Sequence, residues 1–175
     1  GDLLQAQMYV SQMIRMGIVH RLDEAGRLAA IKEFTKIISR YTSNQYAMLC
    51  LLREIAALCN ALGEVVENVR DVVLEAIMIS LAHGSDYVRY AGSLTTRSLA
   101  ASIPTHSISF VSALVNMVQI DHAELVDTPN TKPQEQERIA NSLHGHSNAL
   151  ATLIYTSTKR SLTVSHILCS AVLDT

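Results

Sequence analysis

Tryptophan is absent from the 175 residues, and aromatic side chains make up only 5% of them. Proline occurs three times and glycine seven times, so the strongest turn formers are scarce. β-Sheet proteins place aromatic and β-branched residues in short strands separated by frequent turn residues. Because the chain is 49% hydrophobic but lacks that pattern, we expect an all-α fold with a sizeable core.

An excess of charge of one sign is also missing. The 16 acidic and 14 basic side chains leave a net charge of −2, which provides no field to recruit nucleic acid or anionic lipid. The densest apolar stretch, residues 46–59, is interrupted by Arg53 and Glu54 and is too short to span a bilayer. We therefore expect a protein that neither binds nucleic acid nor inserts directly into a membrane.

Cysteine is rare, and its three occurrences form no motif. Cys50, Cys59 and Cys169 are odd in number and lie in apolar helical contexts. Cysteines of this kind are typical of reduced core residues in an intracellular protein rather than of a disulfide framework. No CxxC motif, glycine-rich phosphate loop or dinucleotide fingerprint is present. The sequence thus predicts no cofactor.

Apolar periodicity and cap residues divide the chain into about eight helices. Two prolines, Pro129 and Pro133, lie in the one clear loop, which we expect at the surface near residues 126–135. Helical pattern reaches both ends, which predicts that residues 1–175 are a single segment of a longer chain. The expected helices cover residues 3–16, 21–41, 45–62, 64–83, 86–103, 105–125, 134–160 and 161–174.

The helices recur at a regular spacing. The caps expected at Asn44 and Asp86 are 42 positions apart, and the stops at Gly63, Gly84 and Pro104 follow one another every 20 or 21 positions. Helices of similar length joined by short turns must be antiparallel neighbours. A helix-pair period near 40 is the signature of HEAT or armadillo repeats. The sequence therefore predicts a right-handed α-solenoid of antiparallel helix pairs.

Two neighbouring helices differ in how apolar they are. Residues 64–83 carry one apolar stripe and a polar face that includes Glu67, Asp71 and Glu75. Residues 45–62 are apolar almost all round, so we expect them to form the most enclosed helix, between neighbours on both sides. This alternation is expected of a two-layer solenoid. The acidic face is either solvated or a contact surface for a basic partner.

The stretch from His83 to Asp86 brings together the residue types of a nucleophilic hydrolase site. A nucleophilic Ser85 would need a histidine within hydrogen-bond reach and a third group to orient it. The alternative is a corner in which Gly84 ends one helix in a left-handed conformation and Ser85 or Asp86 caps the next. The G-x-S-x-G elbow is missing, so we interpret the stretch as a corner.

His144 and His146 form the remaining candidate site. Histidine is a common zinc ligand, but these two lie only two positions apart, on different helical faces. No cysteine or acidic residue stands at ligand spacing. Surface or packing roles are therefore favoured, and we assign no catalytic, cofactor-binding or metal-binding residue.

Three stretches together resemble one protein family. They are residues 9–34, 45–104 and 143–165, which include the motifs VRYAGSLTTRSLAASIP (88–104), GHSNALATL (145–153) and SLTVS (161–165). The order is similar to that in the large HEAT-repeat proteins that accompany the type-one clathrin adaptor between the trans-Golgi network and endosomes in fungi and animals. The chain departs from the family where Ser161 and Ser165 stand at positions often held by proline.

The resemblance implies a non-enzymatic trafficking scaffold that acts through protein surfaces. Its implied partners are the clathrin adaptor complex, its accessory proteins and neighbouring repeats of the same chain, with a homodimer of the full-length protein left open. Its implied location is cytoplasmic, peripherally associated with Golgi and endosomal membranes. The alternative is another HEAT-repeat scaffold, such as a nuclear transport receptor or an assembly platform for a kinase or phosphatase. A nuclear transport receptor would be expected to show a strongly acidic inner face.

Overall fold

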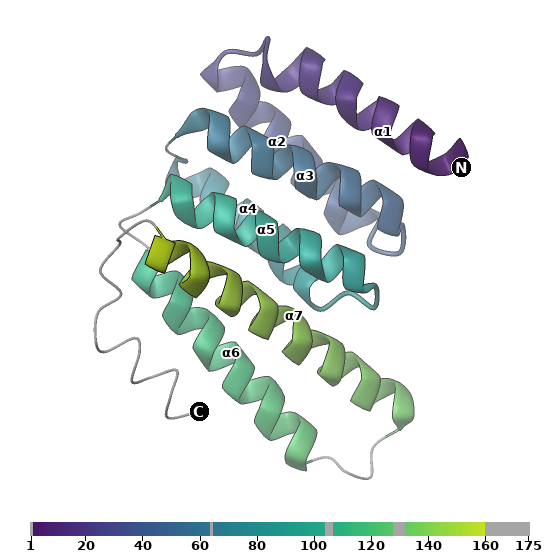
Figure 1. Ribbon diagram of the computed structural model, residues 1–175, viewed down its shortest axis with the longest axis vertical. Coiled ribbons are helices and arrows are strands. Elements are labelled where there is room, and N and C mark those ends of the chain that lie inside the picture. The colour runs from purple at the N-terminus through teal and green to yellow at the C-terminus, as the bar shows by residue number, and fades with distance from the viewer. Residues whose placement is uncertain (1, 64, 104–106, 128–131, 160–175) are drawn as a thin grey trace.

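The computed structural model describes residues 2–63, 65–103, 107–127 and 132–159 (Figure 1). Every regular element in these ranges is a helix, so the predicted all-α class is confirmed there. The helix expected over residues 161–174 lies outside the described residues. The elements are α1 (Asp2–Ile14), the π-helical turn η1 (Arg15–Val19), α2 (Glu24–Arg40), α3 (Gln45–Leu62), α4 (Glu67–Leu81), α5 (Asp86–Ser102), α6 (Ser107–Asp127) and α7 (Pro133–Lys159).

Consecutive helices run antiparallel and form two layers. Helices α1, α3, α5 and α7 lie side by side in one layer, and α2 and α4 lie behind it (Figure 1). The pairs α2–α3, α4–α5 and α6–α7 pack internally, and each pair also contacts the next. The last pair is offset, because α4 contacts α7 but has no contact with α6 in the described part of the chain.

The same-layer helices α3 and α5 meet in a constant register. The Thr95 hydroxyl donates a hydrogen bond to the Leu52 carbonyl at 3.1 Å. The Ser102 hydroxyl donates to the Cys59 carbonyl at 3.0 Å. Both pairs are 43 positions apart, so α3 and α5 run in the same direction, one helix pair apart. This register agrees with the period near 42 read from the caps.

Helix α5 is the most enclosed, which corrects the prediction for residues 45–62. Eleven of its 17 residues are buried, against seven of 18 in α3. The reason is side-chain size: Ala91, Gly92 and Ser93 let α3, α4 and α7 approach closely, and the buried hydroxyls bond to backbone carbonyls instead of needing water. The proportion of apolar residues in a helix therefore did not predict which helix is the most buried.

Side-chain caps set the starts of two helices, of which α3 begins where the sequence predicts and α2 begins at Glu24 rather than at residue 21. The Asp23 carboxylate accepts the Gly26 amide at 2.8 Å, and the Asn44 side chain accepts the Ala47 amide at 3.1 Å. Gly63 follows α3 with a φ of 76°, a conformation that L-residues with a Cβ rarely adopt. Asn44 and Gly63 thus bound α3 as predicted.

The polar face of α4 is also as expected. Glu67, Asp71 and Glu75 are exposed, while the buried stripe of the helix faces α2 and α5. One member of the expected stripe is misplaced, because Val66 is the N-cap residue of α4 and is 46% exposed. The stripe residues that join the core between the layers are Val69, Val73, Ile77 and Leu81.

The connection between α6 and α7 is shorter than the loop predicted for residues 126–135. Helix α6 continues through Asp127, and Pro133 is the first residue of α7, where its fixed φ and missing N–H are tolerated. Residues 128–131 lie outside the described residues. In the described ranges, no helix is both long enough and apolar enough to cross a bilayer.

Candidate functional site

The corner between α4 and α5 closes without a left-handed glycine. Helix α4 ends at Leu81, and the next residue, Ala82, has φ −89° and ψ 2°. The Ala82 amide still bonds to the Met78 carbonyl at 3.3 Å. Within the described ranges, Gly63 alone among the glycines has a positive φ. The left-handed conformation predicted for Gly84 is therefore wrong, since a tightened last turn ends the helix instead.

The cap prediction at this corner is also wrong. Ser85 is the N-cap residue of α5, but its side chain accepts no capping hydrogen bond. Its backbone N–H donates to His83 Nδ1 at 2.9 Å, and the Asp86 carboxylate pairs with Arg89. The Ser85 hydroxyl therefore does not cap α5, and the Asp86 carboxylate is engaged by Arg89 instead.

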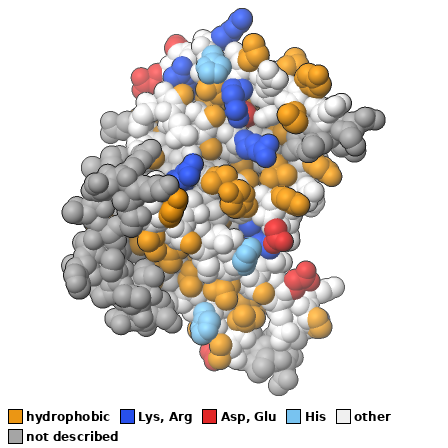
Figure 2. Space-filling view, in the orientation of Figure 1, with side chains coloured by type: hydrophobic (Ala, Val, Ile, Leu, Met, Phe, Trp, Pro, Cys, Tyr) orange, Lys and Arg blue, Asp and Glu red, His pale blue; other side chains and the backbone are white. Residues whose placement is uncertain are grey.

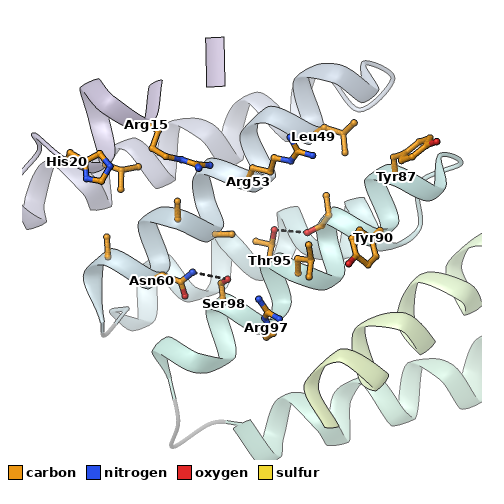
Figure 3. A pocket seen from close by; sticks show the side chains of 16 residues that line it. Arg15, His20, Leu49, Arg53, Asn60, Tyr87, Tyr90, Thr95, Arg97 and Ser98 are labelled. Atoms are coloured by element: carbon orange, nitrogen blue, oxygen red, sulfur yellow. Dashed lines mark hydrogen bonds between the residues drawn. The ribbon is translucent and has the colours of Figure 1, made fainter. Parts of the chain in front are cut away.

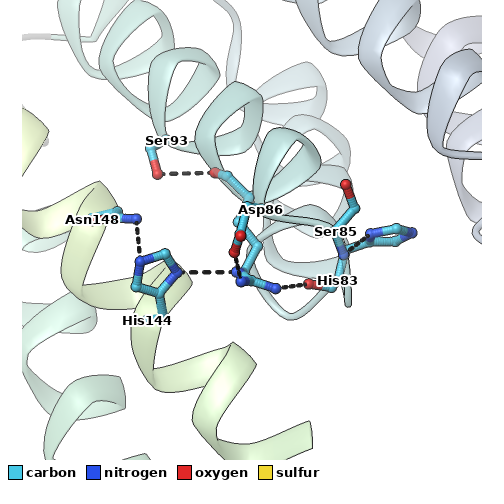
Figure 4. Close-up of polar contacts among 7 residues, drawn as sticks. His83, Ser85, Asp86, Ser93, His144 and Asn148 are labelled. Carbon is cyan, nitrogen blue, oxygen red and sulfur yellow. Dashed lines mark hydrogen bonds and ion pairs between the residues drawn. The ribbon is translucent and has the colours of Figure 1, made fainter. Parts of the chain in front are cut away.

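The geometry does not activate Ser85 as a nucleophile. His83 Nδ1 accepts the Ser85 amide, and His83 Nε2 lies 3.0 Å from the Thr42 carbonyl. Both ring nitrogens are therefore occupied by backbone groups. Figure 4 shows the Ser85 hydroxyl pointing away from the imidazole. A hydroxyl without a base at hydrogen-bond distance lacks what nucleophilic catalysis requires.

Arg89 holds this corner to the next helix pair. Its side chain is 6% exposed and pairs with Asp86. Its Nη1 donates to the His83 carbonyl at 2.6 Å, and its Nε donates to His144 Nδ1 at 3.1 Å (Figure 4). The Asp–Arg pair lies within α5, and the bond between helix pairs goes to a histidine of α7. His144 is thus an exposed residue of α7 that accepts the hydrogen bond from Arg89, and Asn148 Nδ2 lies 3.2 Å from its Nε2.

The side chain of His146 does not share the contacts of His144. It has an acidic partner that the spacing of residues in the sequence did not predict. It is buried, and its Nδ1 lies 2.7 Å from Asp121 Oδ2 and 3.4 Å from the Ser142 hydroxyl. Asp121 comes from α6, 25 positions away, so only the packing of α6 on α7 brings the two together. No cluster of three or more metal-ligating side chains occurs in the part of the chain that the structure describes.

The acidic face of α4 is partly neutralised by its own helix. Arg70 Nη2 lies 2.9 Å from Asp71 Oδ1 and 3.1 Å from Glu67 Oε1. The hydrogen bond to Asp71 raises the pKa of the Arg70 guanidinium, so it stays charged. Glu75 is not paired with Arg70, so one guanidinium partly offsets the charge of three exposed carboxylates on this face.

A groove lies on the opposite layer, between η1, α3 and α5. It encloses about 670 Å³, within the range of about 300–1,000 Å³ usual for binding pockets. We call it the α3–α5 groove; Figure 3 shows the residues that line it. They are Arg15, Val19, His20, Leu49, Arg53, Ala56, Ala57, Asn60, Ala61, Tyr87, Tyr90, Ala91, Leu94, Thr95, Arg97 and Ser98.

The floor of the α3–α5 groove is held by the helix register described above. The Thr95 hydroxyl bonds to the α3 backbone, and Asn60 Nδ2 donates to Ser98 Oγ at 3.3 Å. Four of the sixteen lining residues are alanines of the two helices, namely Ala56, Ala57, Ala61 and Ala91. Their small size opens the surface into a concavity.

Basic side chains dominate the charge of the groove. Arg15 is paired with the fully buried Glu54 at 3.1 Å, and Glu54 also accepts the Ser11 hydroxyl at 2.8 Å. Arg53 and Arg97 are exposed and form no ion pair with the described residues. Among the residues that the structure describes, no acidic side chain lines the groove. The groove therefore carries two uncompensated guanidinium groups.

Two tyrosines mark one end of the groove. Tyr87 is 75% exposed and Tyr90 is 60% exposed, and Figure 3 shows both at the end where α5 begins. Figure 2 shows basic side chains among apolar ones across the upper half of this face, with acidic side chains mainly toward its edges. The arrangement can bind a carboxylate together with an apolar group.

Sequence reasoning missed this groove because its residues come from two separated helices. Arg53 and Arg97 are 44 positions apart and share no short motif. The repeat itself is the signal that could have found them, since a register of 43 places residue 53 beside residue 96.

No protein-family model, curated protein or solved structure matches the chain.

Proposed function

We propose that the chain is a segment of a right-handed HEAT-repeat solenoid that serves as a non-enzymatic scaffold. The observation that carries this proposal is the register of 43 positions between α3 and α5, formed by direct hydrogen bonds. Ser11 of α1 and Glu54 of α3 are joined by a hydrogen bond with the same separation. Repeats that contact only their neighbours, at a constant interval, are the basis of solenoid stability.

The exposed side of α1 supports stacking beyond the described helices. Several of its large apolar side chains, and one of η1, are more than half exposed, which is unusual for an isolated soluble surface. A neighbouring helix pair of the same protein would cover them, as each pair here covers the next. These side chains are Met8, Tyr9, Val10, Met13 and Met16.

Within scaffolds, we assign the chain to clathrin-adaptor-dependent trafficking between the trans-Golgi network and endosomes. The resemblance of residues 88–104 and 145–153 to the adaptor-accessory proteins supports this choice. The partly neutralised face of α4 does not fit the strongly acidic inner surface expected of a nuclear transport receptor. The corner at Ser85 lacks a base, which supports a non-enzymatic role. The proposed location is cytoplasmic, at the periphery of Golgi and endosomal membranes.

Co-purification tests the assignment. The tagged full-length protein is recovered from its native cells, and subunits of the type-one clathrin adaptor are quantified by mass spectrometry. The plasma-membrane clathrin adaptor serves as the matched control. We expect selective enrichment of the type-one adaptor. Enrichment of nuclear transport factors, or of a kinase or phosphatase without any adaptor, would refute it.

A further inference from the structure

We propose that the α3–α5 groove binds a short, extended acidic peptide segment of a partner protein. The peptide's carboxylates lie between Arg53 and Arg97, and an apolar side chain packs on Tyr87 and Tyr90. This inference rests on the proposed scaffold function and names the chemistry of one partner.

Charge complementarity selects the occupant. The buried Glu54 neutralises Arg15, which leaves Arg53 and Arg97 as the charged groups without an acidic partner in the described chain. Guanidinium groups present a planar donor fork that fits a carboxylate in bidentate geometry. Because none of the described side chains that line the groove is acidic, an acidic segment meets no like charge among them. A basic segment would meet two unpaired cations.

The register of the helices places the two arginines at one level. Thr95 bonds to the Leu52 carbonyl, so the residues just beyond them, Arg53 and Arg97, lie near the same height on parallel helices. Figure 3 shows their side chains on opposite sides of the groove, with Thr95 between them. A carboxylate in the middle of the groove can therefore face both cations.

The length of the groove sets the length of the peptide. On α3 the lining runs from Leu49 to Ala61, which is about 18 Å at the helical rise per residue. An extended chain advances about 3.3 Å per residue, so about five residues fill this length. The tyrosines lie beyond the arginines at one end, which places the apolar residue of the peptide at one terminus and the acids near its centre.

Other anionic ligands fit these features less well. Nucleic acid affinity depends on neutralising many phosphates, and recruitment to anionic lipid needs clusters of about four to eight basic residues. The groove offers only two cations without an acidic partner in the described chain. Two cations with an aromatic end match a peptide with few charges and one apolar anchor.

Fluorescence anisotropy tests the inference on the full chain. The probe is a labelled seven-residue peptide with two central glutamates and a terminal leucine, and its comparison carries glutamine in place of both glutamates. We expect saturable binding of the glutamate peptide that weakens as salt rises. The glutamine peptide should bind at least about tenfold more weakly, because the charged hydrogen bonds are lost.

Two charge-matched double variants locate the binding site. Arg53→Glu with Arg97→Glu reverses the groove, whereas Arg40→Glu with Lys132→Glu makes the same charge change at exposed positions outside it. We expect a loss of at least about tenfold for the groove variant and less than about twofold for the control. Circular dichroism of both proteins checks that the fold is retained. If the groove variant unfolds, Arg53→Gln with Arg97→Gln replaces it.

Three results would overturn the inference: no binding of the glutamate peptide, equal binding of the glutamine peptide, or equal loss in the two variants. Binding of phosphatidylserine vesicles or of a single-stranded RNA that depends on the groove arginines, without peptide binding, would also overturn it. The peptide assay uses the purified chain alone, so its failure leaves adaptor co-purification unaffected. Failed co-purification with intact peptide binding would instead refute the trafficking assignment alone.

Discussion

Replacing Gly145 by alanine tests how closely α7 packs on α4. A Cβ at this position would lie 2.7 Å from the Leu81 carbonyl carbon and closer still to its oxygen. Carbon atoms in ordinary contact are about 3.5–4.0 Å apart, and the obstacle is backbone, which cannot rotate away. The two helices must therefore separate by about 1 Å, and neighbouring contacts along the interface are weakened.

The magnitude follows from two opposing effects. Alanine is favoured over glycine within a helix by about 1 kcal/mol, whereas forcing extra volume into a packed interface costs about 1–3 kcal/mol. Because a backbone carbonyl is the obstacle, we expect the upper end of that cost. The net loss is then about 2 kcal/mol, which corresponds to a melting temperature lower by about 4–8 °C for a chain of this size.

Thermal and urea unfolding, followed by circular dichroism, measure the effect. Gly84→Ala is the matched control, because a Cβ there meets nothing within 4 Å and the φ is not positive. That change should be neutral or should stabilise by up to about 1 kcal/mol through the unfolded state. A Gly145→Ala protein as stable as the parent would refute the close approach of α7 to α4.

Three further changes follow from the caps, the core and the cysteines. Asn44→Ala should cost about 0.5–2 kcal/mol in urea unfolding, while Ser85→Ala should cost less than about 0.5 kcal/mol; equal losses would show that Ser85 does cap α5. Leu58→Ala should cost about 2–5 kcal/mol because its side chain is fully buried, and an unchanged melting temperature would place α3 at the periphery. Burial raises the pKa of the Cys59 thiol to about 12, so iodoacetamide at about pH 8 should label the half-buried Cys50 before Cys59. Mass spectrometry reads the order, and faster labelling of Cys59 would contradict its burial.

The fold class and helix pairing could be predicted because they depend on local signals. Asn44, Gly63 and the apolar stripe of residues 64–83 act within one or two turns of chain, and each places a helix boundary or a buried face. Enclosure could not be predicted from the same signals. The buried Glu54 and the small residues of α5 show why, since both depend on which helices lie alongside.

Side-chain partners across the layers were likewise beyond the sequence. Asp121 reaches His146 only because α6 packs on α7, and Arg89 reaches His144 across 55 positions. The cap assigned to Ser85 or Asp86 was wrong for a related reason. The buried Arg89 takes the Asp86 carboxylate, and no local rule includes that competition.

We propose that the chain acts by binding proteins and carries out no chemistry at residues 83–86. A rescue experiment tests this proposal by measuring cargo retrieval in cells that lack the protein. The full-length protein is supplied with Ser85→Ala or with Arg53→Glu and Arg97→Glu, at equal abundance. We expect the Ser85→Ala protein to restore retrieval and the groove variant to fail. A stable Ser85→Ala protein that fails, alongside a groove variant that restores retrieval, would contradict it.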